Sequence, residues 1–286
     1  MAKFTVISAN PEMKDMLYLH NDVEYACPDG DRLAMQIIVP VWKPEGAGFP
    51  LVVFVQGSAW TKPNQFWQLP QLSILARRGY VIASVTHRSA FTAKAPAFLQ
   101  DVKTAIRFLR ANAETYKIDK NRVGVWGTSS GGNTALLVGV TGDDPAFELS
   151  DWAGESSSVK CVVDCFGPTD VTKMVNEHFE NGAFSDMYEI IFALGGSRET
   201  EACNAALNEI NPMRYIKPGC DLPPFMILHG DADELVPYRY SEMMYDRLEE
   251  CGCDVEMVRV TGAPHEDSFW SMQLLEMIFD FIRRKL

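Results

Sequence analysis

Residues 122–137 read RVGVWGTSSGGNTALL, and a sharp turn divides this stretch into two kinds of local structure. Residues 122–126 are rich in β-forming side chains and fit a buried strand, whereas the Ala- and Leu-containing end fits a helix. Between them, residues 127–131 (GTSSG) match G-x-S-x-G, in which a serine occupies a tight strand-to-helix turn between small neighbours. The pattern predicts that Ser129 is a nucleophile at the positive end of a helix. The alternative is a glycine-rich surface turn without chemistry.

Predicted strands and helices alternate along the rest of the chain. Strands are expected at residues 22–27, 32–39, 51–56, 80–85, 159–166, 225–228 and 255–260, and helices at residues 69–78, 98–116, 239–250 and 269–285. This alternation predicts an α/β fold in which helices cover both faces of a mostly parallel sheet. Residues 168–224 lack strand character and are broken by glycines and prolines, so we expect a small lid of two or three short helices. Residues 1–286 would then form a single domain with this one insertion.

The composition restricts the class of protein. The 286 residues are 47% hydrophobic and 22% charged, as in ordinary globular proteins. A net charge of −12 argues against binding to nucleic acid or to an anionic membrane surface. No window approaches the roughly 20 apolar residues of a membrane-spanning helix. The N-terminus also lacks a secretory signal pattern, so we expect a cytoplasmic protein.

The cysteines do not suggest a disulfide framework or a metal site. There are seven, an odd number scattered along the chain, which predicts free thiols. Cys251 and Cys253 flank a glycine, but no second cluster with suitable histidines accompanies them. We therefore expect neither a metal nor an organic cofactor.

A serine hydroxyl needs a base to take its proton, and the base needs a group that orients it. The candidate bases are His20, His87, His178, His229 and His265. His265 lies in a loop after the last predicted strand and before the last helix, where a Ser…Asp…His chain order places the base. His229 ends a strand just before a glycine and is expected to be structural, and His87, which follows a strand, is a candidate for the rim of the site.

The acid is expected in residues 229–237 (HGDADELVP), which follow the penultimate strand of the predicted core. Asp233 is favoured because it lies further out along the turn. Asp231 is the main competitor, although an aspartate directly after a strand often stabilises a turn by bonding to nearby backbone. The predicted order along the chain is then Ser129, Asp233 and His265.

Ester or amide hydrolysis also needs hydrogen-bond donors for the oxyanion. One predicted donor is the backbone N–H of Ser130, the residue after the nucleophile. The second is expected from residues 57–60 (GSAW), which leave a central strand, with Ser58 preferred over Gly57. Trp60 is a candidate for contact with substrate, and the alternative is that it belongs to the core.

Several long motifs give the chain a family resemblance from about residue 22 onward. They are residues 100–119 (QDVKTAIRFLRANAETYKID), 127–132 (GTSSGG), 162–170 (VVDCFGPTD), 211–216 (NPMRYI), 229–238 (HGDADELVPY) and 262–270 (GAPHEDSFW). With these motifs the chain resembles the α/β-hydrolase superfamily and, within it, the carboxylesterase group that includes bacterial feruloyl and acetyl-xylan esterases of the BD-FAE type. The resemblance implies the same three residues, Ser129, Asp233 and His265, as nucleophile, acid and base. The sequence departs from the usual family pattern in two places. Residues 56–60 read QGSAW where relatives usually read His-Gly-Gly-Gly-Trp, and residues 86–90 read THRSA where they often read Tyr-Arg-Leu.

The sequence therefore predicts a serine carboxylesterase acting on a small ester or an esterified oligosaccharide. The expected substrates are feruloyl (hydroxycinnamoyl) or acetyl esters of plant polysaccharide fragments. Aromatic and apolar residues of the predicted lid are candidates for a binding wall, or else pack the lid on the body: Phe179, Phe184, Met187, Tyr188 and Phe192. A peptidase of the prolyl-oligopeptidase kind and a non-catalytic binding protein of the same fold are the alternatives, and a homodimer is compatible with the sequence.

Overall fold

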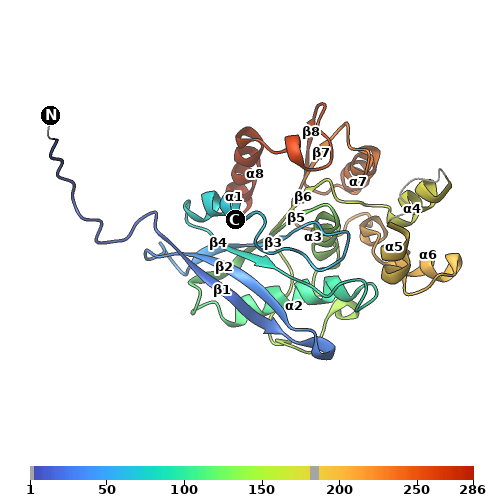
Figure 1. Ribbon diagram of the computed structural model, residues 1–286, viewed down its shortest axis with the longest axis horizontal. Coiled ribbons are helices and arrows are strands. Elements are labelled where there is room, and N and C mark those ends of the chain that lie inside the picture. The colour runs from blue at the N-terminus through green and yellow to red at the C-terminus, as the bar shows by residue number, and fades with distance from the viewer. Residues whose placement is uncertain (1–2, 181–186) are drawn as a thin grey trace.

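The computed structural model describes residues 3–180 and 187–286, which fold around one twisted sheet (Figure 1). Its strands are β1 (Leu17–Ala26), β2 (Leu33–Pro40), β3 (Phe49–Val55), β4 (Val81–Val85), β5 (Ile118–Thr128), β6 (Cys161–Cys165), β7 (Phe225–Gly230) and β8 (Val255–Val260). Their order in the sheet is β1-β2-β4-β3-β5-β6-β7-β8. Only β2 runs antiparallel to its neighbours β1 and β4, and the remaining pairs are parallel. The predicted mostly parallel α/β architecture is confirmed.

Helices cover both faces of the sheet. They are α1 (Leu69–Ala76), α2 (Ala97–Ala111), α3 (Ser130–Thr141), α4 (Val171–Glu180), α5 (Tyr188–Gly195), α6 (Thr200–Glu209), α7 (Arg239–Glu250) and α8 (Met272–Lys285). Successive side chains of a strand point to opposite faces. Val53 and Val55 of β3 accordingly belong to the core cluster under α2, α3 and α7, whereas Val52 and Phe54 belong to the cluster under α1 and α8.

Local sequence explains where the helices begin and end. In α2, Val102, Ala105, Ile106 and Leu109 lie on one helical face and are fully buried. Helix α8 begins at Met272 rather than at the expected residue 269, because the Ser271 side chain caps it by accepting a hydrogen bond from the Leu274 N–H.

The segment between β6 and β7 contains α4, α5 and α6, the kind of helical insertion that residues 168–224 were expected to form. Figure 1 shows these three helices together at the right-hand end of the molecule, away from the N-terminal extension. We refer to them as the α4–α6 insertion.

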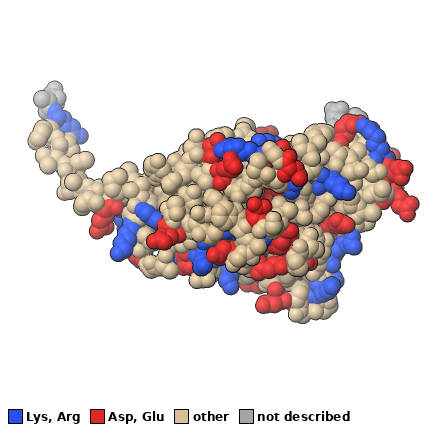
Figure 2. All heavy atoms as spheres, turned by 90° about the horizontal axis from the view of Figure 1, so that it is seen from below, with Lys and Arg blue, Asp and Glu red and all other residues tan. Residues whose placement is uncertain are grey.

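The surface viewed in Figure 2 carries acidic and basic side chains interspersed over much of its area, with no continuous basic stripe on that face. Residues 3–14 extend away from the body of the molecule (Figure 1). Over the residues that the structure describes, every helix is too short or too polar to span a bilayer.

Candidate active site

The loops that carry the predicted functional residues all follow the carboxyl ends of parallel strands. Ser129 follows β5, Asp233 follows β7, His265 follows β8, and residues 57–60 follow β3. Because parallel strands end at the same edge of a sheet, this arrangement gathers the four segments at one place.

The turn at Ser129 has the geometry that the glycine-rich sequence predicts. Ser129 adopts φ 51° and ψ −125°, a strained conformation for a residue with a side chain, directly before α3. A Cβ on Gly127 would lie 1.9 Å from the carbonyl oxygen of Gly131, and a Cβ on Gly131 would lie 2.0 Å from the carbonyl oxygen of Val55. Only glycine therefore lets β5, α3 and β3 approach this closely, and the approach fixes the Ser129 hydroxyl at the sheet edge.

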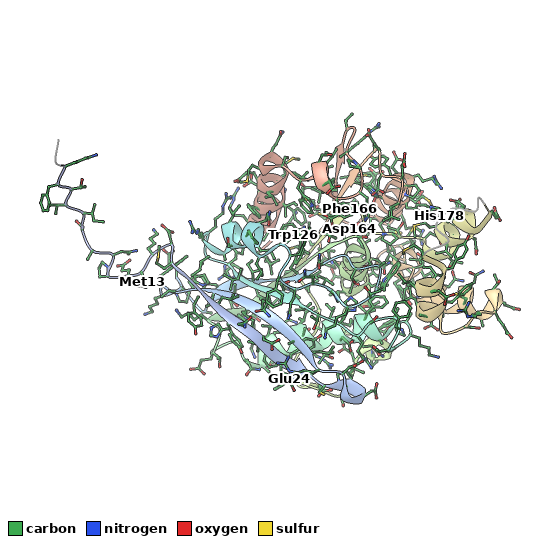
Figure 3. All side chains as sticks on the ribbon, viewed as in Figure 1. Met13, Glu24, Trp126, Asp164, Phe166 and His178 are labelled. Carbon is green, nitrogen blue, oxygen red and sulfur yellow. The ribbon has the colours of Figure 1, made fainter. Side chains whose placement is uncertain are left out.

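A buried carboxyl group lies directly behind this turn. Asp164 of β6 accepts a hydrogen bond from the Gly167 N–H through Oδ1 at 2.9 Å, whereas Oδ2 has no partner among the described residues. A Cβ on Gly132 would lie 2.2 Å from Oδ1, so the glycine leaves room for the carboxyl group. Burial raises the pKa of Asp164 to about 7, which favours the protonated form. Figure 3 labels Asp164 and Phe166 near the centre of the molecule.

The structure brings Ser129, His265 and Asp233 into one hydrogen-bonded row. The Nε2 atom of His265 lies 2.9 Å from Ser129 Oγ, and its Nδ1 atom lies 2.6 Å from Asp233 Oδ2. A carboxylate can only accept, so Nδ1 donates to Asp233 and Nε2 is left to accept the Ser129 proton. This arrangement allows proton transfer from the hydroxyl to the imidazole.

Asp233 accepts four hydrogen bonds. Its Oδ1 atom accepts from the N–H groups of Leu235 and Val236 at 2.9 and 2.8 Å, and its Oδ2 atom accepts from His265 and from His229 Nε2 at 2.6 and 3.1 Å. Burial alone would raise the pKa of Asp233, but the hydrogen bonds from His229 and His265 hold it well below its usual range. The group is therefore a fixed negative charge against the His265 ring.

His229 has a structural role that also reaches the acid. Its Nε2 atom lies 2.8 Å from the Val236 carbonyl oxygen and 3.1 Å from Asp233 Oδ2, so this nitrogen carries the proton. Its Nδ1 atom then accepts from the Ser241 hydroxyl at 2.6 Å. The sequence pattern indicated a structural histidine but not this contact with Asp233, although His229 stands in the same HGDAD motif.

Asp231, the competing candidate for the acid, has a different set of contacts. It accepts hydrogen bonds from Arg259 Nε at 2.7 Å and from the Gly262 N–H at 2.6 Å. These contacts hold the turn after β8 that leads to His265, which agrees with the turn-stabilising alternative for an aspartate in this position.

The loop after β3 is tied to the Ser129 turn by two hydroxyl groups. The Gly57 N–H donates to Thr128 Oγ1 and the Ser58 N–H donates to Ser130 Oγ, both at 2.9 Å. These hydrogen bonds occupy both of the N–H groups that the sequence suggested as oxyanion donors from this loop. Within the described residues, the next N–H along the chain, that of Ala59, has no acceptor.

The departures from the usual glycine-rich loop have visible structural consequences. Ala59 and Trp60 adopt φ values of 50° and 57°, a region that favours glycine. Gln56 braces the loop, because its Oε1 atom accepts from the Asn64 N–H at 2.8 Å. An amide at position 56 thus holds the loop by accepting a backbone hydrogen bond.

A cavity of about 60 Å³ opens beside Ser129. Its wall is largely apolar and comes from three places, namely the loop after β3, the α4–α6 insertion and the loop after β7: Ala59, Trp60, Met174, Val175, His178, Met187, Tyr188, Ile191, Leu235 and Val236. Figure 3 labels His178 on the insertion. Trp60, Met187 and Tyr188 thus line this cavity, and Trp60 is only 3% exposed and also belongs to the hydrophobic core, which was the alternative for this residue.

The other predicted lid residues are Phe179, Phe184 and Phe192. Phe184 and the side chain of Phe179 lie outside the described residues. Phe192 lies under the Arg198 guanidinium, 5.4 Å from ring centroid to Cζ, and lines a separate hollow with Phe91.

His87 is not at the rim of the site, as its place after a strand suggested. It is fully buried, its Nδ1 donates to the Arg88 carbonyl oxygen at 2.7 Å, and its ring packs against Phe98. Burial lowers the pKa of His87 to about 4, so this side chain is a neutral core residue. Over the described part of the chain, no group of three or more His, Cys, Asp or Glu side chains is arranged to hold a metal ion.

A family model described as BD-FAE matches residues 35–248. The chain belongs to the BD-FAE family. Solved structures similar to this BD-FAE member include a truncated form of a carbohydrate esterase from gut microbiota, with a TM-score of 0.79 and 26% identity, covering 96% of this chain and 98% of that one. A bifunctional GH43-CE protein of Bacteroides eggerthii gives a TM-score of 0.77 and 31% identity, covering 96% of this chain and 39% of that one. The predicted α/β-hydrolase fold is thereby confirmed.

Curated proteins related to this BD-FAE member are also esterases by name. Esterase LipC of Mycobacterium tuberculosis is 29% identical over 218 residues, which cover 76% of this chain and 52% of LipC. Isoprenylcysteine alpha-carbonyl methylesterase ICME of Arabidopsis thaliana is 28% identical over 225 residues, which cover 77% of this chain and 51% of that protein. The chain thus spans about half the length of the curated relatives that it matches.

Proposed function

We propose that the protein is a serine carboxylesterase with Ser129 as nucleophile, His265 as general base and Asp233 as the acid that orients His265. The observation that carries this proposal is the row of contacts at 2.9 and 2.6 Å that joins the three side chains. Membership of the BD-FAE family and relatives named as esterases support the same reaction class.

The reaction proceeds in two halves. His265 Nε2 takes the Ser129 proton as Oγ attacks the ester carbonyl, and Asp233 stabilises the imidazolium that forms. The tetrahedral intermediate collapses when His265 protonates the departing alcohol oxygen. Water then attacks the acyl-enzyme as His265 takes its proton, and the carboxylic acid leaves when His265 returns that proton to Ser129 Oγ.

The oxyanion is held by backbone N–H groups. The Ser130 N–H opens α3, where the first turn leaves its N–H groups without an intrahelical acceptor and a helix favours negative charge. The Ala59 N–H is the second donor, because Ala59 lines the cavity beside Ser129 and its N–H is not engaged elsewhere among the described residues. In this proposal Ser58 and Gly57 instead fasten the loop to the Ser129 turn.

The size of the cavity favours a short acyl group. About 60 Å³ is much less than the roughly 300–1,000 Å³ of typical small-molecule sites. An acetyl group suits this space better than the feruloyl group that was the other candidate from the sequence. We therefore place acetyl esters first, with an esterified oligosaccharide as the expected substrate, since similar solved structures include a carbohydrate esterase.

The α4–α6 insertion acts as a lid in this proposal, within a single domain. Met174, Met187 and Ile191 come from the insertion and form much of the apolar wall of the cavity. A wall of this kind excludes water from the acyl group.

Rates with acetylated xylan, p-nitrophenyl acetate and methyl ferulate test the proposal directly. We expect turnover of the two acetyl esters and little turnover of methyl ferulate. A peptide p-nitroanilide tests the peptidase alternative, and a fluorophosphonate probe tests the non-catalytic one. Failure of the probe to label the protein at Ser129, with the Ser129→Ala variant as control, would contradict the proposal.

A further inference from the structure

A second hollow, which we call the aromatic groove, lies at the side of the sheet covered by α1 and α8. It has a volume of about 320 Å³, and its walls include Trp67, Gln68, Gln71, Asp267 and Trp270. The buried Trp126 ring, labelled in Figure 3, forms part of its floor. The groove therefore combines several indole rings with amide and carboxyl groups.

Both walls of the groove continue from the candidate active site. One wall belongs to the chain that leaves the oxyanion loop at residue 60 and reaches Trp67, and the other begins at Asp267, two residues after His265. The Phe166 ring links the two sites, because its centroid lies 4.7 Å from that of His265 and 6.1 Å from that of Trp270. The fully buried Phe166 ring thus lies between the imidazole of His265 and the Trp270 wall of the groove.

The indole N–H groups on the floor and the second wall are already used inside the protein. Trp270 Nε1 donates to Glu266 Oε2 at 2.7 Å, and Trp126 Nε1 donates to Cys165 Sγ at 3.4 Å. These hydrogen bonds fix the two rings, so that what they offer to the groove is ring surface. Rings held in this way bind a flat apolar surface without losing conformational entropy.

The first wall offers an exposed aromatic ring and a carbonyl oxygen without a hydrogen-bond donor. The Trp67 side chain is 65% exposed and that of its neighbour Phe66 is 52% exposed, which is unusual for two adjacent large aromatic residues. The Oε1 atom of Gln68 is shielded from solvent and has no hydrogen-bond partner among the described residues. A buried acceptor without a donor is costly, and rotation of the Gln68 amide toward a ligand hydroxyl in the groove would remove that cost.

We propose that the aromatic groove binds sugar residues on the alcohol side of the ester, a proposal that rests on the esterase function proposed above. A pyranose ring has an apolar C–H face, which would stack on Trp67, and a rim of hydroxyl groups, which would hydrogen-bond to Gln68, Gln71 and Asp267. In this proposal the apolar cavity receives the acyl group, and the aromatic groove receives sugar residues further along the alcohol part of the substrate.

Binding can be tested without catalysis in the Ser129→Ala variant. Xylotetraose and mannotetraose, which carry no ester, are titrated into this variant by calorimetry and by tryptophan fluorescence. We expect at least one of them to bind and to change the fluorescence, and we expect Trp67→Ala in the same background to weaken that binding about tenfold. Phe91→Ala is the matched control, since Phe91 is 60% exposed and lines a different hollow.

Kinetics provide the second test. The ratio of kcat/KM on acetylated xylo-oligosaccharides to kcat/KM on p-nitrophenyl acetate should fall about tenfold in Trp67→Ala and in Gln68→Leu, mainly through KM. The ratio should not change in Phe91→Ala. An unchanged ratio in Trp67→Ala overturns the groove assignment, and so does failure of both tetrasaccharides to bind. The assignment is also overturned if sedimentation shows that the wild type is a dimer and that the Trp67→Ala substitution acts only by dissociating it. Absence of turnover on every ester with retained tetrasaccharide binding would instead contradict the esterase function alone.

Discussion

Replacement of Asp233 by asparagine should damage both turnover and stability. The amide that Asp233→Asn introduces must place its NH₂ group either at the Oδ2 position, against the N–H donors of His229 and His265, or at the Oδ1 position, against those of Leu235 and Val236. The first orientation leaves only the His265 N–H without an acceptor, because His229 Nε2 keeps the Val236 carbonyl oxygen at 2.8 Å, whereas the second leaves two N–H groups without one. At about 1–3 kcal/mol for each unsatisfied donor, the less costly first orientation should lower the free energy of unfolding by about 1–3 kcal/mol.

The effect on turnover has a separate cause. Without a carboxylate at Nδ1, His265 no longer keeps its proton there, and Nε2 is no longer reliably free to accept from Ser129. We expect kcat to fall on the order of 10⁴-fold. In Asp231→Asn the Arg259 and Gly262 contacts change but the Asp233–His265 contact stays, so kcat should change little.

Two measurements check this prediction: kcat with p-nitrophenyl acetate and urea denaturation followed by circular dichroism, for both variants. The reasoning would be refuted if Asp233→Asn kept more than a tenth of the wild-type kcat, or if Asp231→Asn were the variant that lost turnover. An Asp233→Asn variant as stable as the wild type would show that the four hydrogen bonds contribute less than their geometry indicates.

Three further changes test other parts of the structure. Ser129→Ala should lower kcat on the order of 10⁴-fold or more while leaving the urea midpoint unchanged, and a midpoint that falls with activity would point to a folding defect. His229→Phe should lower kcat about tenfold and cost about 2 kcal/mol, since Val236 O and Ser241 lose their partner, and unchanged kcat would mean that Asp233 does not need this support. Asp164 has a folded-state pKa of about 7, above its unfolded value, so its contribution to stability is complete below about pH 4 and is lost as the pH rises through 7. The free energy of unfolding of the wild type should therefore fall by up to about 4 kcal/mol from this group between pH 4 and 8, and urea denaturation of Asp164→Asn should lack that component.

Most of the fold could be read from local patterns, because local signals there agree with the tertiary structure. Helix α7 and strand β8 have the predicted bounds, Arg239–Glu250 and Val255–Val260, since clear turn residues flank both. Strand β1 begins at Leu17, five residues before the expected start, because the polar residues 20–22 and a β-bulge between His20 and Val23 interrupt its apolar pattern.

The details of the site depend on contacts between distant segments, which a pattern in one segment does not reveal. The hydroxyls of Thr128 and Ser130 decide which N–H groups of the loop after β3 are engaged. Similarly, the aromatic groove exists only because the chain before α1 meets the chain before α8. His87 is buried because it packs against Phe98 of α2, and the local sequence of residues 86–90 (THRSA) does not predict this contact.

The glycines around Ser129 have a consequence for how this protein could diversify. Backbone atoms, not side chains, confine Gly127 and Gly131, so substitution there would displace whole strands rather than adjust a pocket. Substitutions that change substrate selectivity must therefore accumulate in segments that tolerate substitution, namely the α4–α6 insertion and the stretch before α1. A mutagenesis library restricted to those two regions should yield altered selectivity, whereas one directed at the turn should yield mostly unfolded chains.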